Sequence, residues 1–361
     1  DESRWYGPFL NNIPDPEKSG LFLYLNTNKM SITLNTRIAT GQEIFKKLVK
    51  EVDILVENNS PRLMTALGFD YQSLKEINPR LIMTSITPYG QTGPYRDYKG
   101  YAMNASALGG MSVCIGEPNR EPLTPPLSLG HYQSGAAAAT GTMFALFARE
   151  FTGEGQYVDI SESDVWAMVH TSHVMTAYVM HGLKRIRWGH RTPGVYPYTV
   201  LPCKDGYISA IAIQGYQWKK FLELMGDGQV PDWYAKDPRF KDRREMSLKY
   251  ADELDGHLAP WLMARTREEI YSQCRERKIP FTPIKKIDEV LTDEHLKERD
   301  YFVEIEHPQA GKLKYPGAPY KCSETPWSIS LPAPLFGEHN EEIYCRRLGY
   351  SREELAQLRQ G

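Results

Sequence analysis

Residues 53–61 read DILVENNSP and decide the fold of the first half of this chain of 361 residues. The segment starts as a short apolar run and ends in Asn-Asn-Ser-Pro, a pattern typical of a buried strand that stops at a turn. Immediately before it, residues 41–50 carry apolar side chains every three or four positions, which predicts an amphipathic helix. The chain therefore enters this region as a helix followed by a strand.

The same plan repeats once along the sequence. Residues 71–77 predict a second helix, and residues 81–86, LIMTSI, predict a second buried strand. Alternating helices and strands are the signature of an open parallel α/β sheet, in which ligands lie beyond the carboxyl ends of the strands. We therefore expect Asn58 and the loop of residues 90–95, GQTGPY, at a ligand-binding edge.

The next elements extend this arrangement. Residues 135–149 are rich in Ala and Gly and predict a buried helix that packs closely on a neighbour. Residues 157–160 predict a strand, and a long helix is expected from residue 161 to about residue 180. Ser161 is interpreted as its N-cap, with Asp164 closing a capping box.

A change of composition at residues 185–198, rich in Arg, Gly, Pro and Tyr, indicates a linker. Beyond it we expect a hairpin around residues 204–206, strands with a turn in residues 304–320, and helices at residues 217–225, 246–264 and 267–277. The expected organisation is a large domain over residues 1–185, a small α+β domain over 200–315, and a C-terminal segment over 320–361 that returns to the large domain.

Composition excludes several classes of function. The net charge is −2 and no basic stripe is present, so nucleic acid is not an expected partner. No apolar run approaches the roughly 20 residues that cross a bilayer, so no membrane insertion is expected. The five cysteines are scattered without metal-binding spacing, which favours reduced thiols in a cytoplasmic protein and no metal site.

Few residues stand out as candidates for chemistry. The chain has neither G-x-G-x-x-G nor a Walker loop, so Lys29, Asn58 and Lys99 remain as candidate phosphate or adenine contacts, although a lone Lys is usually a solvated surface charge. His131 is either an acid–base group or a structural histidine at the end of an element. Tyr101 is either a site residue or an interfacial aromatic.

Two carboxylates near the third strand have structural interpretations. Asp164 is explained as a capping residue in the first turn of a helix. Glu162 beside it is interpreted as solvated. Neither is expected to take part in the chemistry.

Five short motifs occur in an order that resembles the class III CoA-transferase family. They are VENNSP (residues 56–61), NPRLI (78–82), GQTGPY (90–95), GQYVDIS (155–161) and PAPLFGEH (332–339). The likeness covers essentially the whole chain. The family, also called CaiB/BaiF, includes formyl-CoA transferase and α-methylacyl-CoA racemase.

The resemblance implies a Rossmann-like large domain with a parallel sheet, a smaller α+β domain, and two chains interlocked as a homodimer or heterodimer. It implies that acyl-CoA and a carboxylic acid are the substrates, with no metal and no redox cofactor. Lys29, Asn58 and Lys99 match CoA-contacting positions, and Tyr101 matches a Tyr beside the transferred acyl group. It also implies that Asp1 corresponds to a point inside the family's usual sequence, after its opening strand and helix.

The sequence departs from the family at the positions that carry the chemistry. Where the resemblance implies a nucleophilic Asp, which takes the acyl group from the thioester, the chain has His131. Ala102 replaces a Glu of formyl-CoA transferase, and Ala66 replaces an Arg that helps to hold CoA. The His/Asp pair of the racemase branch corresponds here to Tyr101 and His131.

Three hypotheses follow from these departures. In the first, the chain exchanges CoA between an acyl-CoA and a free carboxylic acid as a subunit that works with a related catalytic chain carrying the nucleophile. In the second, His131 itself acts, as in an acyl-CoA hydrolase or a racemase-like enzyme. In the third, the fold only binds an acyl-CoA or supports an oligomer.

Overall fold

The first half of the chain folds around a parallel three-stranded sheet in this computed structural model, which describes residues 1–169 and 171–359. The strand order is β1 (Ile54–Glu57), β2 (Ile82–Thr87) and β3 (Tyr157–Ser161). β2 is central and almost completely buried, as expected for an apolar strand covered on both faces. The predicted parallel α/β sheet is confirmed.

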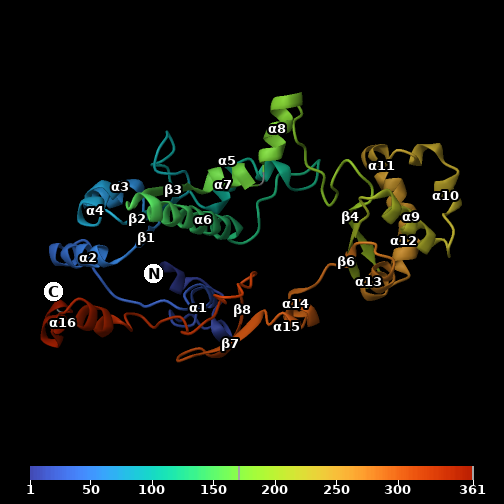
Figure 1. Ribbon diagram of the computed structural model, residues 1–361. Helices are drawn as coiled ribbons and strands as arrows, with labels where there is room; N and C mark the ends of the chain where they lie inside the picture. The colour runs from blue at the N-terminus through green and yellow to red at the C-terminus, as the bar shows by residue number, and fades with distance from the viewer. Residues whose placement is uncertain (170, 360–361) are drawn as a thin grey trace.

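Helices flank this sheet (Figure 1). They are α2 (Ala39–Glu51), α3 (Pro61–Ala66), α4 (Tyr71–Ile77), α5 (Ala102–Leu108), α6 (Leu129–Thr152) and α7 (Glu162–Val169). The next helix, α8 (Ser172–His181), contacts α7 and stands away from the sheet (Figure 1). α6 packs against β2 and β3, and α5 packs against α6 and α7. The side chains of Thr84 in β2 and Thr142 in α6 share a buried hydrogen bond of 2.7 Å.

The helix α6 differs from its prediction in two respects. It begins at Leu129, six residues earlier than expected, so His131 lies in its first turn. Only one stripe, including Ala138 and Ala145, is buried, whereas Phe144 and Phe147 are exposed, so the helix is not fully buried. α6 has 24 residues, yet none of the described helices combines the length and apolarity needed to cross a bilayer.

Two other helix predictions were also wrong. The expected helix from residue 161 to about 180 is divided into α7 and α8, and Thr171 is the N-cap of α8. The expected helix over residues 246–264 is divided at Tyr250 into α11 (Arg243–Lys249) and α12 (Ala251–Met263). In both places hydrophobic periodicity continues across a change of direction, and periodicity alone does not detect that change.

A second region has its own sheet and core. β4 (Tyr198–Cys203), β5 (Gly206–Ile211) and β6 (Phe281–Pro283) pair antiparallel, in the order β4-β5-β6. Helices α9 (Gly215–Met225), α10 (Asp232–Ala235), α11, α12 and α13 (Arg267–Glu276) complete it. Its buried apolar cluster, which includes Trp218 and Phe221, draws all its members from residues 196–281.

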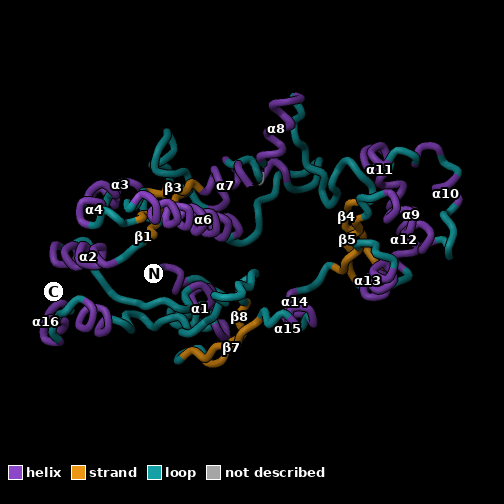
Figure 2. Tube along the Cα trace, viewed as in Figure 1, coloured by secondary structure: helices purple, strands orange, loops and turns teal. Residues whose placement is uncertain are grey.

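The two ends of the chain pack together below the parallel sheet (Figure 2). α1 (Gly20–Leu25) shares a core with the hairpin of β7 (Phe302–His307) and β8 (Gly311–Pro316). Near the C-terminus, a π-helix (Glu341–Arg347) and α16 (Arg352–Leu358) pack on Ile44 of α2. The remaining short elements are α14 (Ile287–Leu291), α15 (Glu294–Glu298) and the 3₁₀ turns Glu2–Trp5, Leu10–Asn12, Ser112–Cys114 and Pro238–Phe240.

Candidate active site

The carboxyl ends of the three parallel strands meet at one edge of the sheet. In the register of the sheet Glu57 lies beside Ser85, and Thr87 lies beside Ser161. Asn58 therefore follows β1 at the same edge at which the loop of residues 90–95 follows β2. This edge is where ligands bind in open α/β sheets.

The loop after β2 is fixed to β3 by a carboxylate. The backbone N–H of Gln91 donates to both carboxylate oxygens of Asp159, at 3.1 and 2.9 Å. Burial raises the pKa of Asp159, and the bonds from Gln91 work in the opposite direction. Gly90 has a φ of +80°, which explains the need for glycine at this turn. The loop is thus a supported part of the edge.

His131 and Glu162 form a pair at this edge. The Nδ1 atom of His131 lies 3.2 Å from Oε2 of Glu162. The imidazole side chain is 58% exposed and the carboxylate side chain only 4% exposed. No described residue is bonded to Nε2 of His131, so the pair presents a ring nitrogen to solvent from a buried anchor.

The electrostatics of the pair have an identifiable cause. The hydrogen bond to Glu162 raises the pKa of His131, while desolvation opposes that rise. The positive end of the α6 dipole also disfavours the imidazolium, because His131 lies in the first turn. The Glu162 carboxylate compensates for that field from the first turn of α7.

The absence of a side chain at Gly130 leaves room for the carboxylate of Glu162. A Cβ atom on Gly130 would lie 2.2 Å from Oε1 of Glu162 and 3.0 Å from Nε1 of Trp166, so glycine leaves open the space that the carboxylate occupies beside His131. Gly130 and Trp166 also line a cavity of about 250 Å³, together with Ala102 and Met103. The pair therefore adjoins a small hollow whose surface is about equally polar and apolar.

Tyr101 lies at the start of α5, next to Ala102 in this cavity wall. Its side chain is exposed, and its backbone N–H donates to Oδ1 of Asn104 at 3.1 Å. α5 and α6 pack against each other, so the structure brings the neighbours of Tyr101 and His131 together around one cavity.

The three residues predicted to contact CoA have different surroundings. Asn58 and Lys99 follow β1 and β2, and an ion pair of 2.7 Å between Arg62 and Asp97 joins the start of α3 to the segment after β2. Lys29 lies after α1, and its ammonium donates to Leu25 O and Asn26 Oδ1. Desolvation lowers the pKa of Lys29. Thus Asn58 and Lys99 share the edge, while Lys29 belongs to the N-terminal segment.

Sequence reasoning missed Glu162. The prediction that it is solvated was wrong, because the N-terminal turn of α6 covers it. Its place directly after β3 was a usable signal, since the same rule placed Asn58 and residues 90–95 at the edge. The interpretation of Ser161 as an N-cap agrees with the bond from the Asp164 backbone N–H to the Ser161 hydroxyl, at 3.3 Å.

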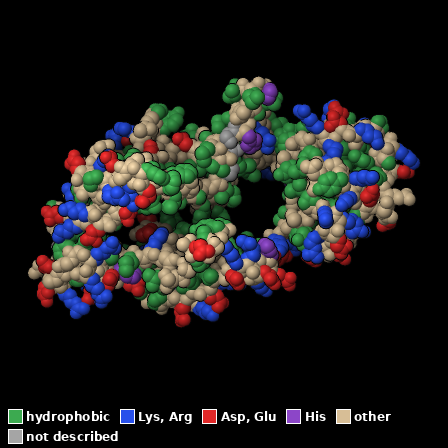
Figure 3. Space-filling view, in the orientation of Figure 1, with side chains coloured by type: hydrophobic (Ala, Val, Ile, Leu, Met, Phe, Trp, Pro, Cys, Tyr) green, Lys and Arg blue, Asp and Glu red, His purple; other side chains and the backbone are tan. Residues whose placement is uncertain are grey.

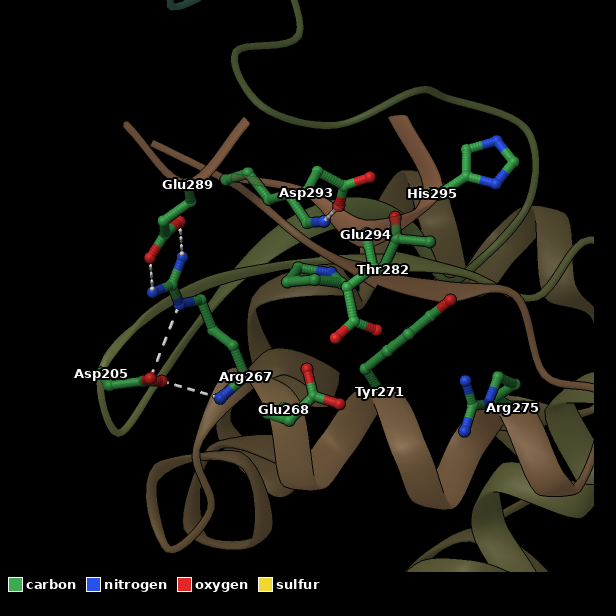
Figure 4. A pocket seen from close by; sticks show the side chains of 12 residues that line it. Asp205, Arg267, Glu268, Tyr271, Arg275, Thr282, Glu289, Asp293, Glu294 and His295 are labelled. Atoms are coloured by element: carbon green, nitrogen blue, oxygen red, sulfur yellow. Dashed lines mark hydrogen bonds and ion pairs between the residues drawn. The ribbon is translucent and has the colours of Figure 1, made fainter. Parts of the chain in front are cut away.

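A larger cavity lies elsewhere, between α13, β6 and the segment of α14 and α15 (Figure 4). It has a volume of about 920 Å³ and a polar lining. The guanidinium of Arg267 in this lining bonds both carboxylate oxygens of Glu289, at 2.9 and 2.7 Å. Neither cavity holds a metal-binding set, since no group of three or more His, Cys, Asp or Glu suited to a metal occurs among the described residues.

Comparison with known proteins gives one consistent family. The family model described as CoA-transferase family III matches residues 1–340. Succinyl-CoA–D-citramalate CoA-transferase of Chloroflexus aurantiacus is 32% identical over 92% of this chain and 82% of its own length. Succinyl-CoA:(R)-benzylsuccinate CoA-transferase subunit BbsE of Thauera aromatica is 30% identical over 99% of this chain and 88% of its own length.

A solved structure supports the same grouping. The crystal structure of a CaiB/BaiF family protein from Brucella suis matches with a TM-score of 0.82 and 28% identity. The match covers 96% of this chain and 89% of that protein. The agreement extends beyond the parallel sheet to nearly the whole fold.

Proposed function

Because this chain belongs to CoA-transferase family III over residues 1–340, we propose that it exchanges CoA between an acyl-CoA thioester and a free carboxylic acid, with the acyl group handled beside His131 and Tyr101. The relatives named above are CoA-transferases that act on succinyl-CoA. Acyl-CoA and a carboxylic acid are therefore the substrates of the proposed reaction, and coenzyme A is carried as a thioester.

The CoA moiety is proposed to bind along the edge where the strands end. Asn58 and Lys99 follow β1 and β2 there, and the loop of residues 90–95 is held by Asp159. Lys29 supplies a further cation from the N-terminal segment. Because desolvation lowers the pKa of Lys29, the protonation of its amine depends on the charges nearby. An anionic phosphate near Lys29 would favour the charged ammonium.

The observation that carries the proposal is the His131–Glu162 pair. An aspartate is absent from residue 131, and the one carboxylate paired with His131 is buried and lies behind the ring. The exposed nucleophile of the site is therefore the imidazole nitrogen Nε2. An imidazole is able to form a covalent acyl intermediate, as histidine nucleophiles do.

The proposed exchange balances without any other reactant. Nε2 attacks the thioester carbonyl, an N–C bond forms, the C–S bond breaks, and CoA leaves as thiolate. The acceptor carboxylate then attacks the acyl-imidazolium, which gives a mixed anhydride and neutral imidazole. Finally, CoA thiolate attacks the acceptor carbonyl of the anhydride, which gives the new thioester and releases the original acyl group as a free carboxylate.

A second candidate function places the acyl-carrying carboxylate on another chain. The specific observation in its favour is that the relative from Thauera aromatica is named as a subunit. In this route His131 marks the position of a lost nucleophile, and the partner chain provides the aspartate. The two routes differ in which polypeptide is modified during turnover.

Assembly with a second chain is part of the proposal. α6 exposes Met143, Phe144, Phe147 and Phe151, whose exposed fractions range from 57% to 77%. Figure 3 shows hydrophobic side chains over this helix, beside a wide opening between the sheet region and the second helical region. An uncovered apolar face of this kind favours a protein partner, and an interlocked homodimer or heterodimer would cover it.

The organisation and location of the chain complete the proposal. The large domain is proposed to comprise residues 1–185, the small domain 200–315, and the C-terminal segment 320–361. The separate apolar cluster within residues 196–281 supports that division. A cytoplasmic location is proposed because acyl-CoA substrates are intracellular, and the five cysteines are all free of disulfides.

The proposal is tested by measuring CoA exchange with a panel of acyl-CoA donors and carboxylic acids. The chain is assayed alone and after co-expression with candidate partner chains of the same family. Exchange that requires His131 supports the first route, and exchange that survives His131→Ala but needs the partner supports the second. Hydrolysis alone, or absence of turnover in every combination, contradicts CoA exchange.

A further inference from the structure

Glu162 has a geometry that neither a helix cap nor a solvated carboxylate requires. Its side chain is 4% exposed, Oε2 lies 3.2 Å from Nδ1 of His131, and Oε1 has no hydrogen-bond partner among the described residues. We propose that Glu162 is the positioning residue for His131: it accepts the Nδ1–H proton and so presents Nε2 to the acyl site. This inference rests on the His131 route proposed above.

The carboxylate is suited to that role and unsuited to direct attack. A group that is 96% buried does not reach a thioester in solution, whereas the half-exposed ring does. Glu162 lies in the first turn of α7 and touches the first turn of α6 through Gly130 and His131. Two helix N-termini therefore favour its negative charge, and an ionised carboxylate is a strong hydrogen-bond acceptor.

The effect on His131 is specific to Glu162. Of the elements packed against α6, α5 and β2 carry no ionisable side chain. β3 carries Tyr157 and Asp159, and α7 carries Asp164 besides Glu162. Within the described residues, Glu162 is the carboxylate in ion-pair contact with His131. A buried anchor that orients a base is the arrangement by which enzymes fix one imidazole tautomer.

A substitution at Gly130 offers an independent way to change the position of the Glu162 carboxylate relative to His131. An alanine there would place Cβ 2.2 Å from Oε1, so the carboxylate would have to shift from its present position, and we expect this shift to disturb its contact with His131. Alanine is otherwise the better helix residue by about 1 kcal/mol. Gly130→Ala is therefore expected to change the position of the Glu162 carboxylate without weakening the helix α6.

The first test is the tautomer of His131, measured by ¹⁵N NMR on the full chain labelled at histidine, with His131→Gln for assignment. We expect the neutral ring of the wild type to carry its proton on Nδ1. In Glu162→Leu, and in Gly130→Ala, the proton is expected to shift to Nε2. Asp164→Asn, in the same turn but exposed, is the matched control and is expected to keep the wild-type tautomer.

The second test is acylation of His131 by diethyl pyrocarbonate, followed by peptide mass spectrometry over a range of pH. Glu162→Gln keeps the size and removes the charge. We expect the midpoint of the rate profile at His131 to fall to a lower pH in this variant, because a nearby opposite charge raises the pKa of an imidazole. Urea unfolding of each variant verifies that it is folded.

The outcomes separate this inference from the proposed function. An Nε2–H tautomer in the folded wild type, or profiles that coincide in wild type and Glu162→Gln, would overturn the role of Glu162. A tautomer and midpoint that depend on Glu162 support it, whether or not CoA exchange is found. If the tautomer and the midpoint of His131 depend on Glu162 but no CoA exchange is found, the result counts against the proposed CoA transfer and not against the role of Glu162.

Discussion

The cavity beside α13 and the cavity beside α6 contrast in size and in the state of their charges. The cavity beside α13 has about 920 Å³ and is lined by many charged side chains, whereas the cavity beside α6 has about 250 Å³. In the large one, Arg267 bonds Glu289 and Asp205, and Lys285 bonds Asp293 (Figure 4). Next to the small one, His131 uses one ring nitrogen for Glu162 and keeps the other free.

The contrast teaches that a large or highly charged cavity is not by itself a reactive site. The ion pairs named in the large cavity connect α13 to α14 and to the turn between β4 and β5, and they connect the segment after β6 to the start of α15. These pairings leave the groups little freedom to react. The arginine Arg267 lowers the pKa of Glu289 to about 2, as expected for a carboxylate committed to a bidentate partner. A nucleophile needs a free electron pair, and the His131 region presents one on a ring that Glu162 holds.

The largest expected effect is that of His131→Ala on CoA exchange. Loss of the imidazole is expected to lower the exchange rate by roughly 10²–10⁴-fold, the usual contribution of a positioned acid–base or nucleophilic group. The measurement is the initial rate with the best acyl-CoA and acid found by screening, in the assembled protein. A rate within a few fold of the wild type would show that His131 has a structural role. The reactive site would then not be distinguished from the large cavity by His131.

The second effect separates the cores of the two regions. Phe221 is completely buried in the cluster of residues 196–281. Phe221→Ala is expected to lower the stability of that region by about 3–5 kcal/mol, because it leaves a cavity in a packed core. Calorimetry is expected to show an early transition for this region and an unchanged transition for the parallel sheet. A common shift of both would mean that the two regions unfold as one unit.

The third effect concerns the large cavity directly. Arg267→Met removes the guanidinium that bonds Glu289 and lies 3.6 Å from a carboxylate oxygen of Asp205, but it keeps most of the apolar stem and the backbone N–H that donates to Asp205. We expect a lower unfolding midpoint and an unchanged rate of CoA exchange, because these charges hold segments together and take no part in transfer. Lys236→Met, at an exposed pair on α10, is the matched control for loss of a cation. A loss of exchange in Arg267→Met alone would place chemistry in the large cavity.

The smallest effects are opposite dependences of stability on pH. The pKa of Glu289 is lowered, so its contribution is present above the usual value near 4.5 and is lost as the pH falls toward about 2. The pKa of His131 is raised, so its contribution is present below the usual value near 6.5 and is lost as the pH rises through the folded-state value.

Difference profiles isolate these two contributions. Urea unfolding midpoints of Glu289→Gln and His131→Gln are compared with the wild type across the pH range. The difference for Glu289→Gln is expected to vanish at acid pH, and that for His131→Gln to diminish at alkaline pH. Profiles that run in the same direction would contradict the assignment of the two groups.

The parallel sheet and its ligand edge were predictable because their signals are local. Residues 53–61 and 81–86 each contain an apolar run and a turn, and the side-by-side ends of parallel strands follow from topology. The loop of residues 90–95 could therefore be placed before any side chain was known. The anchoring of Gln91 by Asp159 required the register of β3.

The His131–Glu162 pair was not predictable, because it depends on where α6 begins. Ser128 precedes α6 without a side-chain cap, and Gly130 is a poor helix former, so no sequence signal marks a start at Leu129. A helix beginning at residue 135 leaves Glu162 uncovered and solvated. The six additional residues cover it and place His131 against it.

The most direct test of the account is the product of hydroxylamine trapping during turnover with acyl-CoA. An acyl group on His131 is released to hydroxylamine as a soluble acyl hydroxamate, and the protein stays unmodified. An aspartyl or glutamyl thioester instead leaves a hydroxamate on the protein, which peptide mass spectrometry locates. Because hydroxylamine also cleaves acyl-CoA directly, the protein-free rate is subtracted. We predict an additional, protein-dependent yield of soluble hydroxamate that is lost in His131→Ala; a hydroxamate on a carboxylate of either chain, with no soluble yield that depends on His131, would contradict the account.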